Sequence, residues 1–394
     1  MSKPDVNKPV RAVKSIFLIC GLGMSSWAPM VPYAKERLQL NDASLGLLLL
    51  FLGGGAITMM PVSGWLSHRF GSRIVILIGS IILAVSLPLL LLTPGSLTLG
   101  IMLFVFGAAL GTVDVAMNAH GVQVQNLKGN TIMSSLHGLF SVGGLVGALG
   151  LGVLISAGLH PVWAAVSIAV LMIIIVSNSY HSLLTASAEK NINGFVAHSE
   201  KANHGPGNWL TAGVIFLGTM CFIAFLAEGA MLDWSAIFLR ENRAVPEAFA
   251  GTGYAAFSIA MAAMRLMGDR IIAGFNSRVV VIAGSIVGAA GLLLAVLTPW
   301  TITAILGFLM LGSGAANIVP VFFSEAGRLP GVPPAIAIPA ITTMGYAGQL
   351  AGPAALGYIA HRSSLPIALG VCGFLLVIVA LTYSLRTKNT TVTA

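Results

Sequence analysis

Long apolar runs separated by short polar turns make up almost the whole chain. A helix needs about 20 mostly apolar residues to cross the hydrocarbon core of a bilayer, and the long charge-free intervals are about one to three times that length. Turn residues divide two of them, 74–113 at Thr93-Pro94-Gly95 and 129–188 at Gly158-Leu159-His160-Pro161. The pattern predicts twelve membrane-spanning helices over residues 14–36, 43–67, 74–93, 97–121, 131–157, 161–181, 209–239, 248–270, 278–297, 301–325, 333–359 and 364–386.

A repeat relates the two halves of the chain. Residues 69–94 align without a gap on residues 274–299, at an offset of 205, and 13 of the 26 pairs are identical. The shared Phe-x-Ser-Arg, Gly-Ser-Ile and Leu-Thr-Pro are more specific than general hydrophobicity explains. Polar residues dominate the interval between the sixth and seventh predicted helices, as in a flexible linker. We therefore expect an all-α membrane protein of two parallel six-helix bundles, 1–184 and 209–394, joined by a linker at 185–208.

Composition and charge placement support a membrane protein and give its orientation. The chain is 57% hydrophobic and only 8% charged, whereas about a quarter of the residues of a soluble domain are charged. Fourteen of the 20 Lys and Arg fall in the termini and loops of one predicted side, five fall on the other, and Arg265 lies within a span. Positive loops stay in the cytoplasm, so both termini and the linker are expected there. The net charge of +8 then reflects topology and does not indicate a nucleic-acid partner.

Motifs for enzymatic, redox or metal chemistry are missing from the sequence. Cys20, Cys221 and Cys372 lie inside apolar runs, and none forms a Cys-x-x-Cys pair. No Gly-Lys-Ser/Thr loop for ATP is present, and no nucleophile, base and oxyanion arrangement is evident. We expect neither an enzyme nor a bound cofactor or metal.

The turn between the second and third predicted helices carries Gly64, Leu66, Arg69, Gly71 and Arg73. These residues match the motif Gly-x-Leu-Ala-Asp-Arg-x-Gly-Arg-Arg, so the chain resembles the members of the major facilitator superfamily. His68 stands in place of the motif's acid. A weaker echo, Gly268-Asp269-Arg270, keeps an acid in the second half. The resemblance covers essentially the whole chain and implies two bundles that alternate in access about a central site.

Two further motifs point to a subgroup of this superfamily. Asp114-Val115-Ala116-Met117-Asn118-Ala119 and the segment Glu228-Gly229-Ala230-Met231-Leu232-Asp233-Trp234-Ser235 are similar to motifs of a bacterial subgroup. The subgroup includes the rhizopine-biosynthesis membrane protein, and fucose permease-like sugar symporters are more distant relatives. The resemblance implies a polar, sugar-like or polyol-like solute.

Polar side chains inside the apolar runs are the candidates for a solute site, because a polar group in hydrocarbon is costly unless it faces a cavity or a partner. Neutral donors and acceptors suit a polyol, and the face of a tryptophan can stack on a sugar ring. Tryptophan is also an ordinary anchor at a membrane interface. The candidate solute-binding residues are Trp27, Asn118, Trp234, Asn317, Tyr346 and Gln349.

Buried acids are the candidates for proton coupling. One face of the fourth predicted helix carries, at spacings of 4, 3 and 4, the residues Gly107, Gly111, Asp114 and Asn118. The glycines favour a close approach of a second helix. Asp114 then titrates in the cavity, with His137 as its nearest candidate partner, or is simply hydrogen-bonded between helices. In the seventh helix, Asp233 is rotated well away from Glu228, so the two acids are not expected to share a role. The proton-coupling candidates are Asp114, His137, Glu228 and Asp233.

Charged residues and glycines at the predicted cytoplasmic helix ends are candidates for gating. Ion pairs and helix-end contacts there could hold one side closed, although topology alone would also explain the arginines. The candidates are Gly64, Arg69, Gly71, Arg73, Arg265, Asp269 and Arg270.

Three functions are compatible with these residues. The first is a secondary transporter of a small polar solute, proton-coupled or facilitative, acting as a monomer in the lipid bilayer. The second is an exporter of amphipathic compounds by proton antiport, which an apolar, aromatic cavity would favour. The third is a membrane receptor on the same fold that transports nothing.

Overall fold

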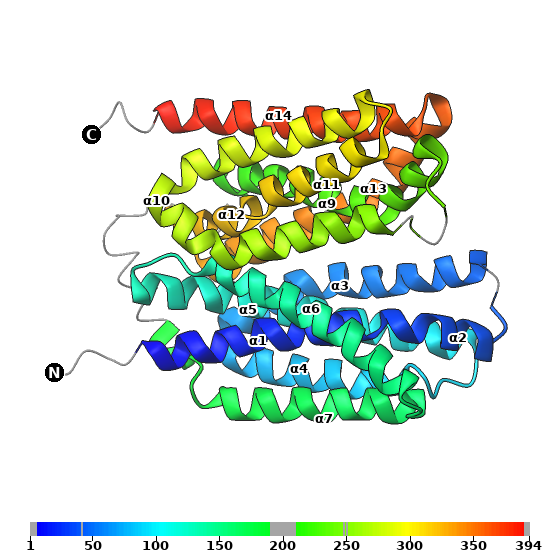
Figure 1. The fold of residues 1–394 in the computed structure, drawn as a ribbon. Coiled ribbons are helices and arrows are strands. Elements are labelled where there is room, and N and C mark those ends of the chain that lie inside the picture. The colour runs from blue at the N-terminus through cyan, green and yellow to red at the C-terminus, as the bar shows by residue number, and fades with distance from the viewer. Residues whose placement is uncertain (1–5, 41, 190–209, 247–248, 250, 390–394) are drawn as a thin grey trace. The chain divides into compact units, whose positions relative to one another are not determined.

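Helices account for every regular element in the described part of the chain. The structure is a computed structural model that describes residues 6–40, 42–189, 210–246, 249 and 251–389 (Figure 1). Ten helical stretches of the described residues are long and apolar enough to cross a membrane, when Thr301–Ala326 is counted as one stretch. The elements are α1 (Asn7–Ser26), η1 (Ala28–Met30), α2 (Val31–Arg37), α3 (Asp42–Phe70), α4 (Ser72–Leu89), α5 (Ser96–Lys128), α6 (Met133–Ser156), α7 (Pro161–Tyr180), α9 (Ala212–Arg243), α10 (Thr252–Leu297), α11 (Thr301–Ala315), α12 (Ile318–Ala326), α13 (Pro334–Arg362) and α14 (Leu365–Asn389).

The prediction of an all-helical membrane protein is confirmed, and the exact number of spans stays a prediction. The first predicted span is divided between α1, η1 and α2. The predicted spans 248–270 and 278–297 run together in α10, which has 46 residues. The predicted span 301–325 is interrupted between α11 and α12. Helix α13 matches the eleventh predicted span but is not one of the ten candidates.

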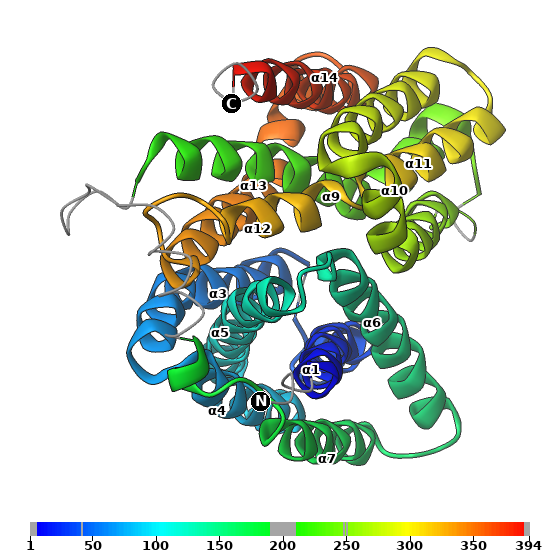
Figure 2. The same cartoon turned by 90° about the vertical axis from the view of Figure 1, so that its left-hand side faces the viewer.

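The chain divides into two compact units. Unit 1 comprises Met1–Ile132, Leu139–Trp209 and Gly327–Ala340, and unit 2 comprises Met133–Gly138, Leu210–Ala326 and Ile341–Ala394. In unit 1, helix α1 packs beside α4, α5 and α7, and Figure 2 shows it nearly end-on. In unit 2, α10 packs along α11 and α14. The predicted bundle boundaries remain predictions, and residues 190–208 of the predicted linker lie outside the described residues.

The repeat seen in the sequence extends to the backbone at one helix junction. Asn276 interrupts α10 with φ 61° and ψ 160°, and its side-chain Oδ1 accepts a hydrogen bond from the Val279 N–H at 3.1 Å. This is how an N-cap residue starts a new helix. The residue at the offset of 205 is Gly71, which precedes α4 with φ +86°. Glycine and asparagine are the residues that tolerate positive φ best, so both copies turn at the same position.

Small residues let α3 and α5 lie in backbone contact. A Cβ atom on Gly55 would collide with the Phe104 carbonyl oxygen, and one on Gly107 would collide with the Leu52 carbonyl oxygen. A Cβ on Gly111 would lie 2.6 Å from the Ala56 oxygen. The expected close approach at the glycines of the fourth predicted helix is therefore confirmed, and it fixes the rotation of α5 within unit 1.

Two neighbouring glycines of α3 provide a test of this packing. Gly55→Ala should lower the melting temperature of the purified protein, because overpacking costs about 1–3 kcal/mol. Gly54→Ala is the matched control, since nothing lies within 4 Å of its Cβ position. Both changes bring the same gain in helix propensity, so the difference between them measures the contact. Equal melting temperatures for the two variants would contradict the close approach of α3 and α5.

Candidate functional site

A buried ion pair joins two helices of unit 2. The Arg265 guanidinium of α10 donates from Nη2 to both carboxylate oxygens of Glu228 on α9, at 3.1 and 3.3 Å. The side chains are only 9% and 15% exposed. A charge removed from water at such depth is tolerated when an opposite charge and further hydrogen bonds compensate it. Sequence reasoning assigned Glu228 to proton coupling and Arg265 to gating, and the structure brings the two together.

A break between α11 and α12 provides the second partner of Arg265. Pro320 has no N–H, so it cannot bond the carbonyl of Ala316 four residues earlier. The free Ala316 oxygen accepts instead from Arg265 Nε at 3.1 Å. Next to it, Asn317 Nδ2 donates to the Met264 carbonyl of α10 at 3.2 Å. Asn317 was expected in the middle of a continuous helix and lies instead at this break, where it and Arg265 tie α10 to α11 and α12.

The first turn of α6, which groups with unit 2, is held by Asp269. Its two carboxylate oxygens accept from the backbone N–H groups of Ser134 at 3.1 Å and Ser135 at 3.2 Å. These N–H groups have no partner within their own helix, and a carboxylate there is favoured by the helix dipole. One turn later, His137 stacks on Phe323 with ring centroids 5.6 Å apart. Asp269 thus contacts the end of another helix, while the ion pair of Arg265 goes to Glu228.

The remaining candidates of unit 2 lie near these helices in different surroundings. Trp234 is half-buried against Gly357, and its indole N–H has no hydrogen-bond partner among the described residues. Tyr346 packs on Phe225, with ring centroids 5.5 Å apart. A Cβ on Gly229 would lie 3.2 Å from the side chain of Gln349. Asp233 and Arg270 are exposed.

Unit 1 holds a buried acid whose charge has no cationic partner in the described part of the chain. Asp114 on α5 is 7% exposed, and the side chain that hydrogen-bonds it is Asn118 on the next turn. Asn118 Nδ2 donates to the Asp114 carbonyl at 2.9 Å and to Oδ1 at 3.3 Å. The Asn118 Oδ1 atom and the indole N–H of buried Trp27 have no partner among the described residues. Unit 1 therefore offers an unused acceptor and an unused donor inside the protein.

The motif residues of unit 1 lie at the end of α3 and the start of α4. Gly64 packs against Pro339, where a Cβ would collide with the ring. Arg69 is exposed and lies over the ring of Trp65 at 5.4 Å. Arg73 lies over the ring of Tyr180 at 4.0 Å, and Gly71 makes the turn between the helices. Within the described ranges, both arginines of the motif contact aromatic rings rather than carboxylates.

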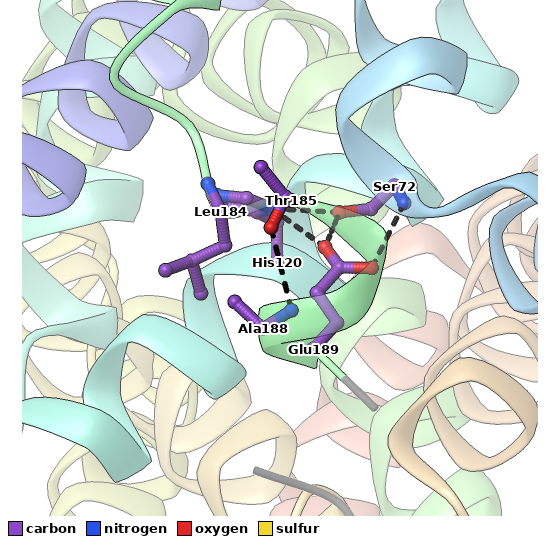
Figure 3. A network of polar contacts seen from close by, with 6 residues as sticks. All are labelled: Ser72, His120, Leu184, Thr185, Ala188 and Glu189. Carbon is purple, nitrogen blue, oxygen red and sulfur yellow. Dashed lines mark hydrogen bonds and ion pairs between the residues drawn. The ribbon is translucent and has the colours of Figure 1, made fainter. Parts of the chain in front are cut away.

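Sequence reasoning missed one buried polar network. Ser72 of α4, His120 of α5 and Glu189 after α7 bond one another in the interior of unit 1 (Figure 3). Glu189 falls in the interval that was predicted to be a flexible linker, and His120 was not among the candidate site residues. The repeat gave one usable signal, because the offset of 205 places His120 opposite Glu325. In unit 2, Glu325 accepts a hydrogen bond from Tyr383.

Long apolar helices with paired or hydrogen-bonded polar groups between them are the architecture of a multi-pass membrane protein. The family model of the Major Facilitator Superfamily matches residues 15–334, and the chain belongs to this superfamily. It is therefore a multi-pass membrane protein of a transporter family, as its motif turn predicted.

Three similar proteins show the range of the relationship. An uncharacterised MFS-type transporter of Yersinia pestis is 46% identical over 378 residues, which are 96% of this chain and 95% of the relative. The membrane protein MosC of Rhizobium meliloti is 30% identical over 368 residues, which are 93% of this chain and 88% of the relative. A crystal structure of the E. coli fucose:proton symporter FucP superposes with a TM-score of 0.73 at 13% identity. The superposition covers 96% of this chain and 98% of the FucP chain. At this low identity, the similarity shows the fold alone.

The ion pair of unit 2 can be tested with a double-mutant cycle. Arg265→Met leaves the Glu228 carboxylate buried without its partner, which typically costs about 3–5 kcal/mol of stability. Adding Glu228→Gln removes the stranded charge, so the double variant should regain much of the lost melting temperature. The two single variants and the double variant are compared in one detergent. Losses that simply add would show that the two charges do not interact.

Proposed function

We propose that this member of the superfamily is a secondary active transporter of a small polar, sugar- or polyol-like solute, coupled to protons and working by alternating access. The observation that supports coupling is that one buried carboxylate has a cationic partner and another has none in the described part of the chain. Arg265 balances Glu228, whereas Asp114 lies buried with the Asn118 amide beside it. An unbalanced carboxylate inside a membrane helix tends to be neutralised, by a proton or by a cation. Asp114 is accordingly the leading proton carrier, with Glu228 second.

The proposed topology has twelve spans, with bundles 1–184 and 209–394 and a linker at 185–208. Both termini lie in the cytoplasm and the protein sits as a monomer in a bacterial inner membrane. The positive loops support this orientation. The repeat and the N-cap at Asn276 support treating α10 as two spans rather than one.

The solute class rests on neutral polar groups and on relatives. Side chains that donate and accept without charge suit hydroxyl groups; the proposed solute-binding residues are Trp27, Asn118, Trp234, Asn317, Tyr346 and Gln349. One structural neighbour is a fucose:proton symporter. We assign gating to the α3–α4 motif residues, to Arg270 and to Asp269, whose bond to the start of α6 is of the kind that forms and breaks as a carrier changes state.

Asp114 can be tested once a solute is in hand. A thermal-shift screen with neutral sugars, inositols and lipophilic cations identifies it, since a ligand of the folded state raises the melting temperature. In proteoliposomes, Asp114→Asn should abolish uptake driven by a proton gradient and leave solute exchange intact, because the amide keeps the shape of the carboxyl group but takes up no proton. Adding Asn118→Asp to the Asp114→Asn protein is not expected to restore proton coupling.

Other outcomes would point elsewhere. Gradient-driven uptake by a folded Asp114→Asn protein would remove Asp114 from the mechanism. Stabilisation by lipophilic cations alone would favour an exporter of amphipathic compounds. Stabilisation without any transport would favour a receptor.

A further inference from the structure

Three consecutive residues of the α3–α4 turn (residues 71–73) each contact the end of α7 or the segment that follows it. A Cβ on Gly71 would lie 2.7 Å from the Cβ of Ala186. Ser72 bonds Glu189 through its backbone and side chain. Arg73 lies 4.0 Å from the ring centroid of Tyr180. All of these residues belong to unit 1, so the first residues of the predicted linker are docked on the motif turn.

Glu189 is the centre of this contact (Figure 3). It is 5% exposed, and three donors converge on its carboxylate. The Ser72 N–H donates to Oε2 at 3.1 Å, the Ser72 hydroxyl donates to Oε1, and His120 Nδ1 lies 3.1 Å from Oε1. Ser72 is the first residue of α4, so its N–H has no partner within the helix and lies at the positive end of the helix dipole. The carboxylate supplies both the acceptor and the charge that this helix end lacks.

His120 links α5 to Ser72 of α4 and to Leu184 and Glu189 of the segment that follows α7. Its Nε2 atom accepts from the Leu184 backbone N–H at 3.3 Å, so the ring proton lies on Nδ1. Nδ1 faces both the Ser72 hydroxyl, at 2.6 Å, and Glu189. His120 is fully buried and Leu184 nearly so. Buried hydrogen bonds thus connect the start of α4, helix α5 and the segment that follows α7.

We propose that Glu189 is a positioning residue for gating, and that it provides the α3–α4 turn with the acid that the motif lacks at His68. The proposal rests on the gating role assigned to this turn. It places residues 185–189, the first part of the predicted linker, with unit 1. It also gives Gly71 a second reason to be glycine, since a side chain there would push Ala186 away.

The second copy supports the assignment by contrast. At the equivalent of His120, unit 2 has its own acid, Glu325 on α12, bonded to Tyr383 on α14. Arg278, the equivalent of Arg73, donates to the Ser384 carbonyl at 3.1 Å. In unit 2 the acid at this position of the repeat lies on α12, whereas in unit 1 the acid beside His120 comes from the segment after α7.

Amide hydrogen exchange on the full-length protein in nanodiscs tests the proposal without a known solute. Glu189→Ala should speed exchange at the Ser72 and Leu184 amides by about 10- to 100-fold, because a hydrogen bond to a charged group is lost. Glu189→Gln keeps one acceptor oxygen and should speed exchange less. Glu241→Gln, a change at an exposed acid of α9, is the matched control and should change neither amide.

Transport by the same variants separates positioning from simple stability. With the solute found by thermal shift, Glu189→Ala should lower the maximal rate roughly tenfold with little change in KM, because the turn loses a charge-assisted hydrogen bond. Glu189→Gln keeps an acceptor oxygen and should restore part of the rate. Unchanged exchange at Ser72 in a folded Glu189→Ala protein would overturn the contact. Faster exchange with an unchanged maximal rate would overturn the role in gating. A protein that transports nothing would contradict the proposed function, while the exchange rates would still decide whether Glu189 positions the turn.

Discussion

A charge inside a membrane-spanning helix has to be neutralised where it lies, because hydrocarbon holds no water to solvate it. In unit 2 this requirement links residues on three helices. Pro320 frees the Ala316 carbonyl, which holds Arg265 Nε, and the other side of the same guanidinium holds Glu228. A proline in α12 therefore fixes the position of an acid on α9 through an arginine on α10. Any movement of one of these helices changes the surroundings of the other two.

Helix ends impose the same requirement in a milder form. The first N–H groups of a helix lack partners, and an acid or amide can serve them. Asp269 serves α6, Asn276 serves the second part of α10, and Glu189 serves α4. Each of these contacts is made by a residue from outside the helix body that it caps. Such contacts are strong enough to favour one arrangement and weak enough to exchange during a transport cycle, which suits residues that open and close an access path.

The sequence was sufficient for the family, for the helical membrane fold and for the glycine contacts, because each depends on local pattern. The motif around Gly64 and Arg69 identified the superfamily, and hydropathy located the apolar helices. The pair of Glu228 and Arg265 could not be foreseen, since helix rotation decides which two of several buried charges meet. Pro320 was a signal in the sequence for the break between α11 and α12, which the spacing of apolar residues did not reveal. Glu189 was hidden by its polar neighbours, which are typical of a linker. The solute-binding residues stay predictions.

Coupling of solute to protons is the central claim, and charge movement measures it most directly. Proteoliposomes on a solid-supported membrane are exposed to the neutral sugar or inositol that stabilises the protein, at equal pH on both sides. A neutral solute carries no charge of its own, so we expect a transient current of positive charge in the direction of the solute, which disappears when a protonophore lets the protons leak back. Uptake of the labelled solute without any current would contradict proton symport and would leave a carrier that only equilibrates its solute.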